Sequence, residues 1–238
     1  LWSGAFSWEL AGFEARSVAR RIQTELEQII VNGSHSGECH PRGRDPKAEQ
    51  FCSDAAAFMT RFTAADCGRA QQSFRSAMEA APDEADGYAG FALAAMQAQF
   101  LQDASSGAKA VEARIAAAHA IALDANSAAA QLARGSLVAL LDWDLSTAAE
   151  YFGRAERLSG GKWSDGTCGA SYALLYLIPR SQFSQAVDEL QALSRNFPAD
   201  QFVRYALGLS LLFGGREAEA LATFEKMREM DDRWGMLA

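Results

Sequence analysis

Four residues between positions 35 and 52 have side chains that bind metal ions or form disulfides: His35, Cys39, His40 and Cys52. Imidazole nitrogen and thiolate sulfur are both zinc ligands, and a closed zinc site needs four of them in a tetrahedron. The spacing here matches no zinc motif. Three alternatives are open: a metal site, free thiols, or a disulfide from Cys39 to Cys52 or Cys67, which would indicate an oxidising compartment such as the periplasm.

The other candidate catalytic groups have structural interpretations. Asp142 and Asp144 flank Trp143, but their position between two predicted helices favours capping of the second helix by Asp144. His119 lies among alanines, which is typical of a surface or packing residue. Residues 159–166, SGGKWSDG, lack the first glycine and the preceding strand of a phosphate-binding loop, so we expect a turn. The sequence therefore predicts neither an enzyme nor a bound cofactor.

The helices that would position these groups repeat one pattern. In residues 148–158, AAEYFGRAERL, two alanines flank an aromatic residue at spacings of four and three, which places all three on one helical face. The pattern occurs five times: Ala70, Phe74, Ala77; Ala113, Ala117, Ala120; Ala148, Phe152, Ala155; Ala186, Leu190, Leu193; Ala220, Phe224, Met227. A turn-compatible residue follows the third member of each copy by five positions, at Pro82, Ala125, Gly160, Pro198 and Asp232.

The distances between copies are 113−70=43, 148−113=35, 186−148=38 and 220−186=34 residues. A period of this length with two helices in each unit is the signature of an α-solenoid. In the first helix of three units a small residue stands at the position facing the partner helix: Ala92, Gly135 and Gly208. Because glycine weakens a helix interior, these glycines predict close packing of two helices.

These residues resemble the tetratricopeptide repeat, in which an aromatic residue, a Leu-Gly pair, and then Ala, Phe, Ala and Pro recur. The resemblance covers residues 47–238 and departs in the second unit, where about nine extra residues, QDASSGAKA, separate the two helices. It implies an all-α fold, a right-handed superhelix of about five helix hairpins. The N-terminal residues 1–46 are expected to form a separate segment, with a helix at about 13–31 followed by a loop.

A finer resemblance lies in LDANSAAAQLARGSLVALLDWDLSTAAEYFGRAERL, which is similar to the tetratricopeptide region of bacterial winged-helix transcriptional regulators and class III adenylate cyclases. The N-terminal LWSGAFSWELAGFEARSVARRIQTEL is similar to the segment that precedes those repeats, which runs from a Leu-Trp strand into an amphipathic helix, although Ser7 stands where an acidic residue is usual. This resemblance implies that residues 1–46 are the remnant of an upstream α/β domain. It also implies a sensory or interaction module of a bacterial regulator, or alternatively the regulatory region of a cyclase.

The inner surface of such an array is lined by the first helix of each unit. The resemblance places eight residues there: Asp86, Ala89, Leu93, Met96, Phe202, Tyr205, Leu209 and Leu212. They are largely apolar, so they either form an open groove for a protein, a peptide or a small effector, or are covered by a neighbouring element or a dimer partner. The helix around Gly208 is apolar on both sides, and we expect it to be buried against a second copy, the N-terminal segment or a ligand helix.

Composition limits the partners further. The net charge of −8 opposes nucleic-acid binding, and no apolar run is long enough for a membrane span. A protein or peptide, or a second copy of the chain, is the expected partner. The cytoplasm is the favoured location, and the periplasm is the alternative that a Cys39 disulfide would indicate. A metal or cofactor protein, or an enzyme, remains the alternative from another functional class.

Overall fold

A computed structural model describes residues 45–101, 107–163 and 165–230, all of which belong to the compact unit from Arg44 to Ala238. These residues form helices joined by short turns and contain no strand. The α-helices are α2 (Pro46–Met59), α3 (Ala64–Ala80), α4 (Ala85–Gln99), α5 (Gly107–Leu123), α6 (Ala128–Leu137), α7 (Leu145–Ser159), α8 (Gly166–Tyr172), α9 (Phe183–Asn196), α10 (Gln201–Phe213) and α11 (Glu217–Met230).

The helices begin where the sequence supplies a side chain that can accept a backbone hydrogen bond. The side chains of Asp45, Thr63, Ser127, Asp144, Asp165 and Asp200 accept bonds from the first turns of α2, α3, α6, α7, α8 and α10. These bonds satisfy amide groups that have no partner within the helix. Helix α7 ends at Gly160, whose φ of 61° lies in the left-handed region favoured by glycine.

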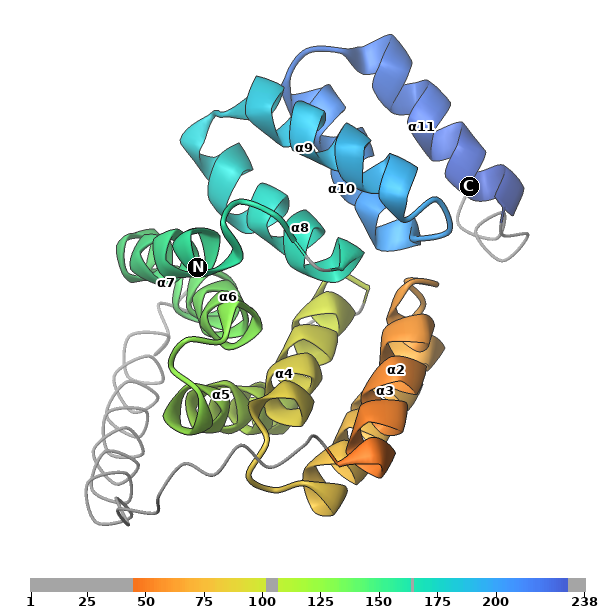
Figure 1. Ribbon diagram of the computed structural model, residues 1–238. Coiled ribbons are helices and arrows are strands. Elements are labelled where there is room, and N and C mark those ends of the chain that lie inside the picture. The colour runs from red at the N-terminus through yellow and green to blue at the C-terminus, as the bar shows by residue number, and fades with distance from the viewer. Residues whose placement is uncertain (1–44, 102–106, 164, 231–238) are drawn as a thin grey trace, which may run out of the picture. The chain divides into compact units, whose positions relative to one another are not determined.

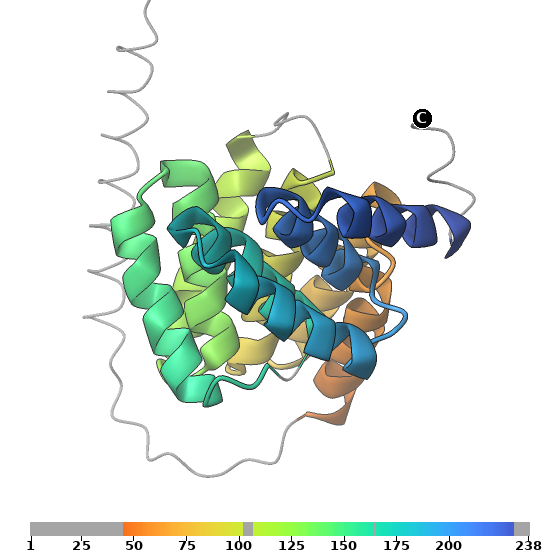
Figure 2. The same cartoon turned by 90° about the horizontal axis from the view of Figure 1, so that it is seen from above.

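The helices pair in sequence order into five hairpins, α2 with α3 through to α10 with α11, which we number one to five (Figure 1). The first helices of successive hairpins also contact one another, so that α2, α4, α6, α8 and α10 form one continuous row. Figure 2 shows the same described hairpins from above. The arrangement confirms the prediction of an all-α array of stacked hairpins.

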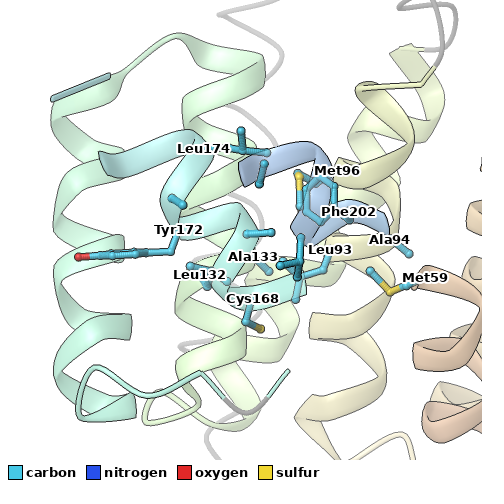
Figure 3. Packing of buried hydrophobic residues seen from close by; sticks show 14 of the residues in the cluster. Met59, Leu93, Ala94, Met96, Leu132, Ala133, Cys168, Tyr172, Leu174 and Phe202 are labelled. Carbon is cyan, nitrogen blue, oxygen red and sulfur yellow. The ribbon is translucent and has the colours of Figure 1, made fainter. Parts of the chain in front are cut away.

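The core consists mainly of the residues of the repeated pattern. Of its fifteen members, fourteen are buried, with exposed fractions between 0% and 7%, while Phe224 of the last helix is half-buried. Eleven of the fourteen belong to one cluster that runs through all five hairpins, and Figure 3 shows part of this cluster, including Phe202 of α10 with Leu93 and Met96 of α4. The small residues allow close approach, as predicted: a Cβ on Gly135 would lie 3.3 Å from the Ala148 carbonyl oxygen.

Two first helices end in a wide turn that was not predicted from the sequence. Helix α6 continues into a π-helical turn, η1 (Val138–Asp142), and α8 continues into η2 (Ala173–Leu177) followed by a 3₁₀ turn, η3 (Ile178–Arg180). Trp143 and Ser181 then take left-handed conformations, with φ of 55° and 59°. These residues reverse the chain between the two helices of hairpins three and four.

Close packing in hairpin five gives a first testable prediction. A Cβ on Gly208 would lie 2.5 Å from the Phe224 ring. We therefore expect Gly208→Leu to lower the free energy of unfolding by about 1–3 kcal/mol through overpacking. Urea unfolding would measure this, with Gly153→Leu as the control, because the nearest atom to a Cβ at Gly153 is 3.5 Å away, on the Arg157 side chain. Equal midpoints for the two variants would contradict the prediction.

Several predictions concern residues outside the described ranges. These are the helix at 13–31, the strand and loop of residues 1–44, the candidate ligands His35, Cys39 and His40, most of the QDASSGAKA insertion, and the turn at Asp232. Within the described part of the chain, no helix is long and apolar enough to cross a membrane.

Candidate interaction surfaces

The predicted surface residues of hairpin two lie on the row of first helices, but most of them are buried. Ala89, Leu93 and Met96 are exposed by 1%, 4% and 0%, and Asp86 at the start of α4 is half-buried. Since α4 packs between α2 and α6, this part of the row is covered by its neighbours.

The predicted residues of hairpin five range from buried to exposed along α10. Phe202 is fully buried, Tyr205 and Leu209 are half-buried, and 44% of Leu212 is exposed. The residues near the start of α10 therefore have a covering that the residues at its end lack.

The covering comes from hairpin one. The turn between α2 and α3 inserts Phe62, whose ring centroid lies 4.9 Å from that of Phe202 and 5.1 Å from that of Tyr205. Phe100, which follows α4, completes an aromatic cluster at 5.8 Å from Phe202 and 6.3 Å from Tyr205. Only 1% of Phe62 is exposed, so its side chain is fully buried in this packing, while Arg61 of the same turn stays exposed.

A backbone hydrogen bond reinforces this packing. The Gln201 N–H donates to the Thr60 carbonyl oxygen at 2.8 Å, which joins the start of α10 to the α2–α3 turn. We call Thr60 and Phe62 of hairpin one, together with Gln201, Phe202 and Tyr205 of hairpin five, the closing contact. It joins the first and last hairpins of the described array.

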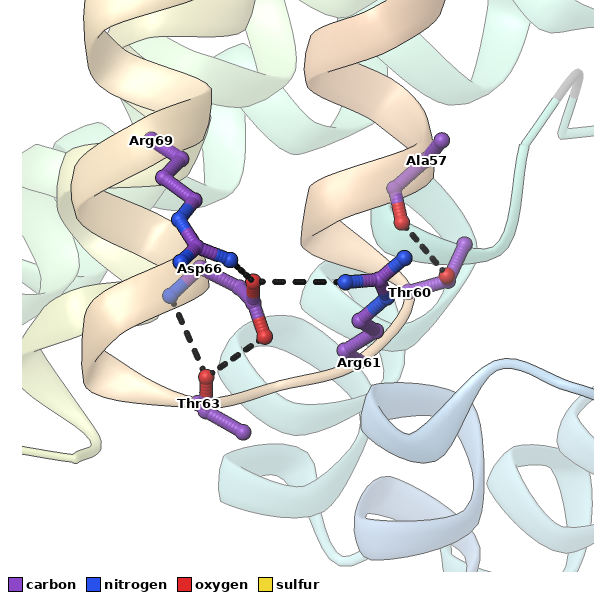
Figure 4. A network of polar contacts seen from close by, with 6 residues as sticks. All are labelled: Ala57, Thr60, Arg61, Thr63, Asp66 and Arg69. Carbon is purple, nitrogen blue, oxygen red and sulfur yellow. Dashed lines mark hydrogen bonds and ion pairs between the residues drawn. The ribbon is translucent and has the colours of Figure 1, made fainter.

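The turn is held in shape by a polar network within hairpin one (Figure 4). The Asp66 carboxylate, 1% exposed, accepts a hydrogen bond from Thr63 Oγ1 at 2.8 Å and pairs with Arg69 at 3.1 Å and Arg61 at 3.6 Å. Asp66 N–H donates in return to Thr63 Oγ1 at 3.1 Å. Thr63 thus caps α3 through its hydroxyl, and the Asp66 carboxylate ties Thr63 and Arg61, the residues on either side of Phe62, to the first turn of α3.

The closing contact was not predicted from the sequence. The predicted covers for α10 were a second copy, the N-terminal segment and a ligand helix, whereas the structure covers its start with the α2–α3 turn. The available signal was Phe62, a large aromatic residue directly before Thr63, which can cap a helix, because residues between helices are normally polar.

Two of the cysteines are deeply buried. Cys67 is fully buried and its thiol donates to Gln97 Oε1 at 3.5 Å. Burial, with a smaller effect of the Asp66 charge, raises the pKa of Cys67 to about 12, and burial raises the pKa of the 3%-exposed Cys168 well above its usual range. Because the thiolate is the reactive form, neither thiol is suited to nucleophilic chemistry. A pairing of Cys39 stays a prediction, since Cys39 lies outside the described residues.

A different kind of surface lies at the turn between η1 and α7. Trp143 is 83% exposed and Leu145 is 50% exposed. The turn is fixed on both sides: Asp142 pairs with Arg114 of α5 at 2.5 Å, and Asp144 accepts the Thr147 N–H at 3.0 Å. The Asp144 cap confirms the interpretation from sequence, and this backbone hydrogen bond from Thr147 is the main cause that lowers the pKa of Asp144.

The ion pair of Asp142 brings this turn beside the middle of α5. Val111 and Ile115, within one helical turn of Arg114, are 42% and 43% exposed. We call Val111, Ile115, Trp143 and Leu145 the apolar patch. His119, further along α5, is exposed and packs edge-on to the Tyr88 ring at 4.4 Å, as expected of a surface residue.

Asp200, which caps α10, is a buried carboxylate beside the closing contact. It accepts bonds from Phe202 N–H and Val203 N–H at 2.9 and 3.1 Å, and is 2% exposed. Burial raises its pKa from 3.8 to about 6. The nearby Asp165 adds to the rise, while the two backbone bonds and Arg204 oppose it.

This shift predicts a pH dependence of stability. Between about pH 4 and 6 folded Asp200 keeps a proton that the unfolded chain has lost. Its contribution therefore makes the free energy of unfolding fall as pH rises, by up to about 3 kcal/mol over the window. Asp200→Asn keeps a capping side chain without the charge. Urea unfolding at several pH values should show a shallower fall for the variant; identical pH profiles would contradict the assignment.

Comparison with known proteins gives a likeness of fold only. No family model matches the chain, and no curated protein matches its sequence. Among solved structures, a thermophilic TPR protein of Thermus thermophilus, TTC0263, aligns with a TM-score of 0.51 at 15% identity, over 76% of this chain and 90% of that one.

Two other structures align more loosely. The MamA protein aligns with a TM-score of 0.41 at 16% identity, and YrrB, described as a TPR protein with an unusual peptide-binding site, with 0.42 at 15%. Both alignments cover 80% of this chain and 94% of the other. With the five hairpins and the repeated core pattern, the likeness to the Thermus protein shows that the described chain has the all-α fold of a tetratricopeptide-repeat solenoid.

Proposed function

We propose that this chain is a non-catalytic protein-interaction module that binds its partner through the apolar patch around Trp143. The observation that carries the proposal is the 83% exposure of Trp143 on a turn whose two neighbours are both held by polar contacts. Tryptophan is among the residues that contribute most to protein interfaces, and a side chain on a fixed turn loses little conformational freedom on binding.

The row of first helices is largely buried, which favours a partner-binding site on the outer surface of the array rather than in an inner groove. Four of the eight residues predicted to line the groove are buried by the chain itself: Ala89, Leu93, Met96 and Phe202. Tyr205, Leu209 and Leu212 are left as candidates for a second contact, on the part of α10 beyond the buried Phe202.

The wider setting of this module is proposed from the sequence resemblance. The Asp142-Trp143-Asp144 segment is the residue-level support for a role in a bacterial transcriptional or signalling regulator, or in a cyclase. The same turn carries the exposed tryptophan, so one segment supports both the setting and the contact.

Site-specific cross-linking tests the proposal. A photoreactive residue at Ser146, exposed and one turn from Trp143, is introduced into the protein in its source cells. We expect a discrete adduct that is lost with Trp143→Ser and kept with Leu221→Ser, which removes another exposed apolar residue, 60% exposed, from α11. An adduct of twice the chain mass identifies a second copy as the partner, and any other mass identifies a different protein. No adduct, or an adduct indifferent to Trp143→Ser, would overturn the proposal.

A further inference from the structure

The closing contact joins two hairpins that are not neighbours in the array. In repeat proteins, each unit is stabilised by its own packing and by the units next to it. Hairpins one and five are separated by three others, yet Phe62 and Thr60 contact α10 directly. Because few residues make this contact, it can open while every hairpin keeps its own core and its neighbours.

The turn that makes the contact is formed without the help of hairpin five. The network of Thr63, Asp66, Arg61 and Arg69 lies wholly within hairpin one. Arg61 and Arg69 also lie over the Phe58 ring, at 5.8 and 5.9 Å from its centroid. The turn therefore acts as a preformed plug and needs no refolding when it enters or leaves its site.

Phe62 has a left-handed backbone conformation that is held from within hairpin one. Its φ is 49°, in a region that bulky residues rarely occupy. Such a conformation persists only where the surroundings hold it. Here Phe62 N–H donates to the Met59 carbonyl oxygen at 3.2 Å, and the bond from Thr63 Oγ1 to Asp66 fixes the next residue. The turn therefore keeps its shape whether or not the ring lies between Phe202 and Tyr205.

Opening would uncover an apolar strip on α10. Phe202 and Tyr205 lie on the same side of the helix as Leu209 and Leu212, and exposure rises from 0% at Phe202 to 44% at Leu212. Phe62 of hairpin one and Phe100 of hairpin two together cover the buried end of this strip. A ligand that needs the whole strip must first displace Phe62, so its apparent affinity falls with the fraction of open molecules.

From these observations we propose that Phe62 is an autoinhibitory plug, and that release of the α2–α3 turn from α10 is the conformational step that exposes the apolar strip of α10. The plug does not depend on the apolar patch around Trp143. Failure of one proposal therefore leaves the other standing.

Distance and hydrogen-exchange measurements on the full chain test this. Spin labels are placed at Ala56 and Ala222, exposed positions on hairpins one and five, with Cys39 and Cys52 replaced by Ser; the two remaining cysteines are buried. Phe62→Gly removes the ring and relieves the strain. We expect it to broaden and lengthen the label distance and to speed exchange of the Gln201 amide by at least about tenfold, because exchange follows the open population.

Phe51→Ala is the matched control, since Phe51 is a half-buried aromatic residue of the same hairpin that packs against the cluster of Ala48, Ala77 and Ala81 rather than against the turn or α10. It should leave the label distance and Gln201 exchange at parent values. If Phe62→Gly unfolds hairpin one, seen as rapid exchange throughout α2 and α3, Tyr205→Ala tests the same contact from hairpin five. Parent-like distances and Gln201 exchange in a folded Phe62→Gly or Tyr205→Ala variant would overturn the proposal.

Discussion

Phe202→Ala is expected to lower the free energy of unfolding by about 3–5 kcal/mol, which is the usual cost of deleting a fully buried phenylalanine ring. Phe202 is 0% exposed and packs against Phe62 and Phe100 from two other hairpins. The cavity left by alanine would lie where hairpins one, two and five meet, and backbone restraints such as the Gln201–Thr60 bond limit its collapse. Urea unfolding followed by far-UV circular dichroism measures the loss.

Phe213→Ala on the same helix is the control for this measurement. Phe213 is 56% exposed, so its removal should change stability by no more than about 0.5 kcal/mol. Combining Phe202→Ala with Phe62→Ala should cost less than the sum of the two single changes, because the rings contact each other. Equal losses for Phe202→Ala and Phe213→Ala would show that the aromatic cluster does not stabilise the array.

Phe152→Ala should cost a similar amount, about 3–5 kcal/mol, by a different route. Phe152 is 0% exposed in the middle hairpin, beside Tyr176 at 5.5 Å and Tyr172 at 6.4 Å. Since repeat arrays transmit stability between neighbours, a weakened third hairpin should also uncouple hairpins one and two from four and five. We expect a broader urea transition as well as a lower midpoint.

Leu158→Ala is the matched change on α7, because Leu158 is 43% exposed and lies on the same helix. It should leave the width of the transition unchanged. A sharp, parent-like transition for Phe152→Ala, with a loss below about 1 kcal/mol, would contradict the central role of this ring.

The repeat array could be predicted because its sequence pattern lies within single helices. Spacings of four and three place Ala148, Phe152 and Ala155 on one helical face, and all three are buried as expected. The same holds for the small residues: Gly135 and Gly208 were identified as close-packing positions from helix propensity. A Cβ at Gly208 would lie 2.5 Å from the Phe224 ring, and one at Gly135 would lie 3.0 Å from the Tyr151 Cβ.

The candidate surfaces could be predicted only in part, because burial depends on contacts distant in sequence. The pattern on α10 showed that Phe202 and Tyr205 were apolar on the inner side, but nothing in that helix indicates that the α2–α3 turn covers them. The exposure of Trp143 could not be predicted either, because it follows from the π-helical turn η1 and from the left-handed backbone conformation of Trp143 itself. Neither has a reliable sequence signal at a single position.

The closing contact also orders events during synthesis. Thr60 and Gln201 are 201−60=141 residues apart, so at typical translation rates the α2–α3 turn leaves the ribosome roughly 7–30 s before its partner helix. Helical hairpins form within microseconds to milliseconds, so the first four can assemble while Phe62 is still solvent-exposed. During synthesis the α2–α3 turn thus stays accessible to chaperones. The closing contact forms only when the fifth hairpin emerges.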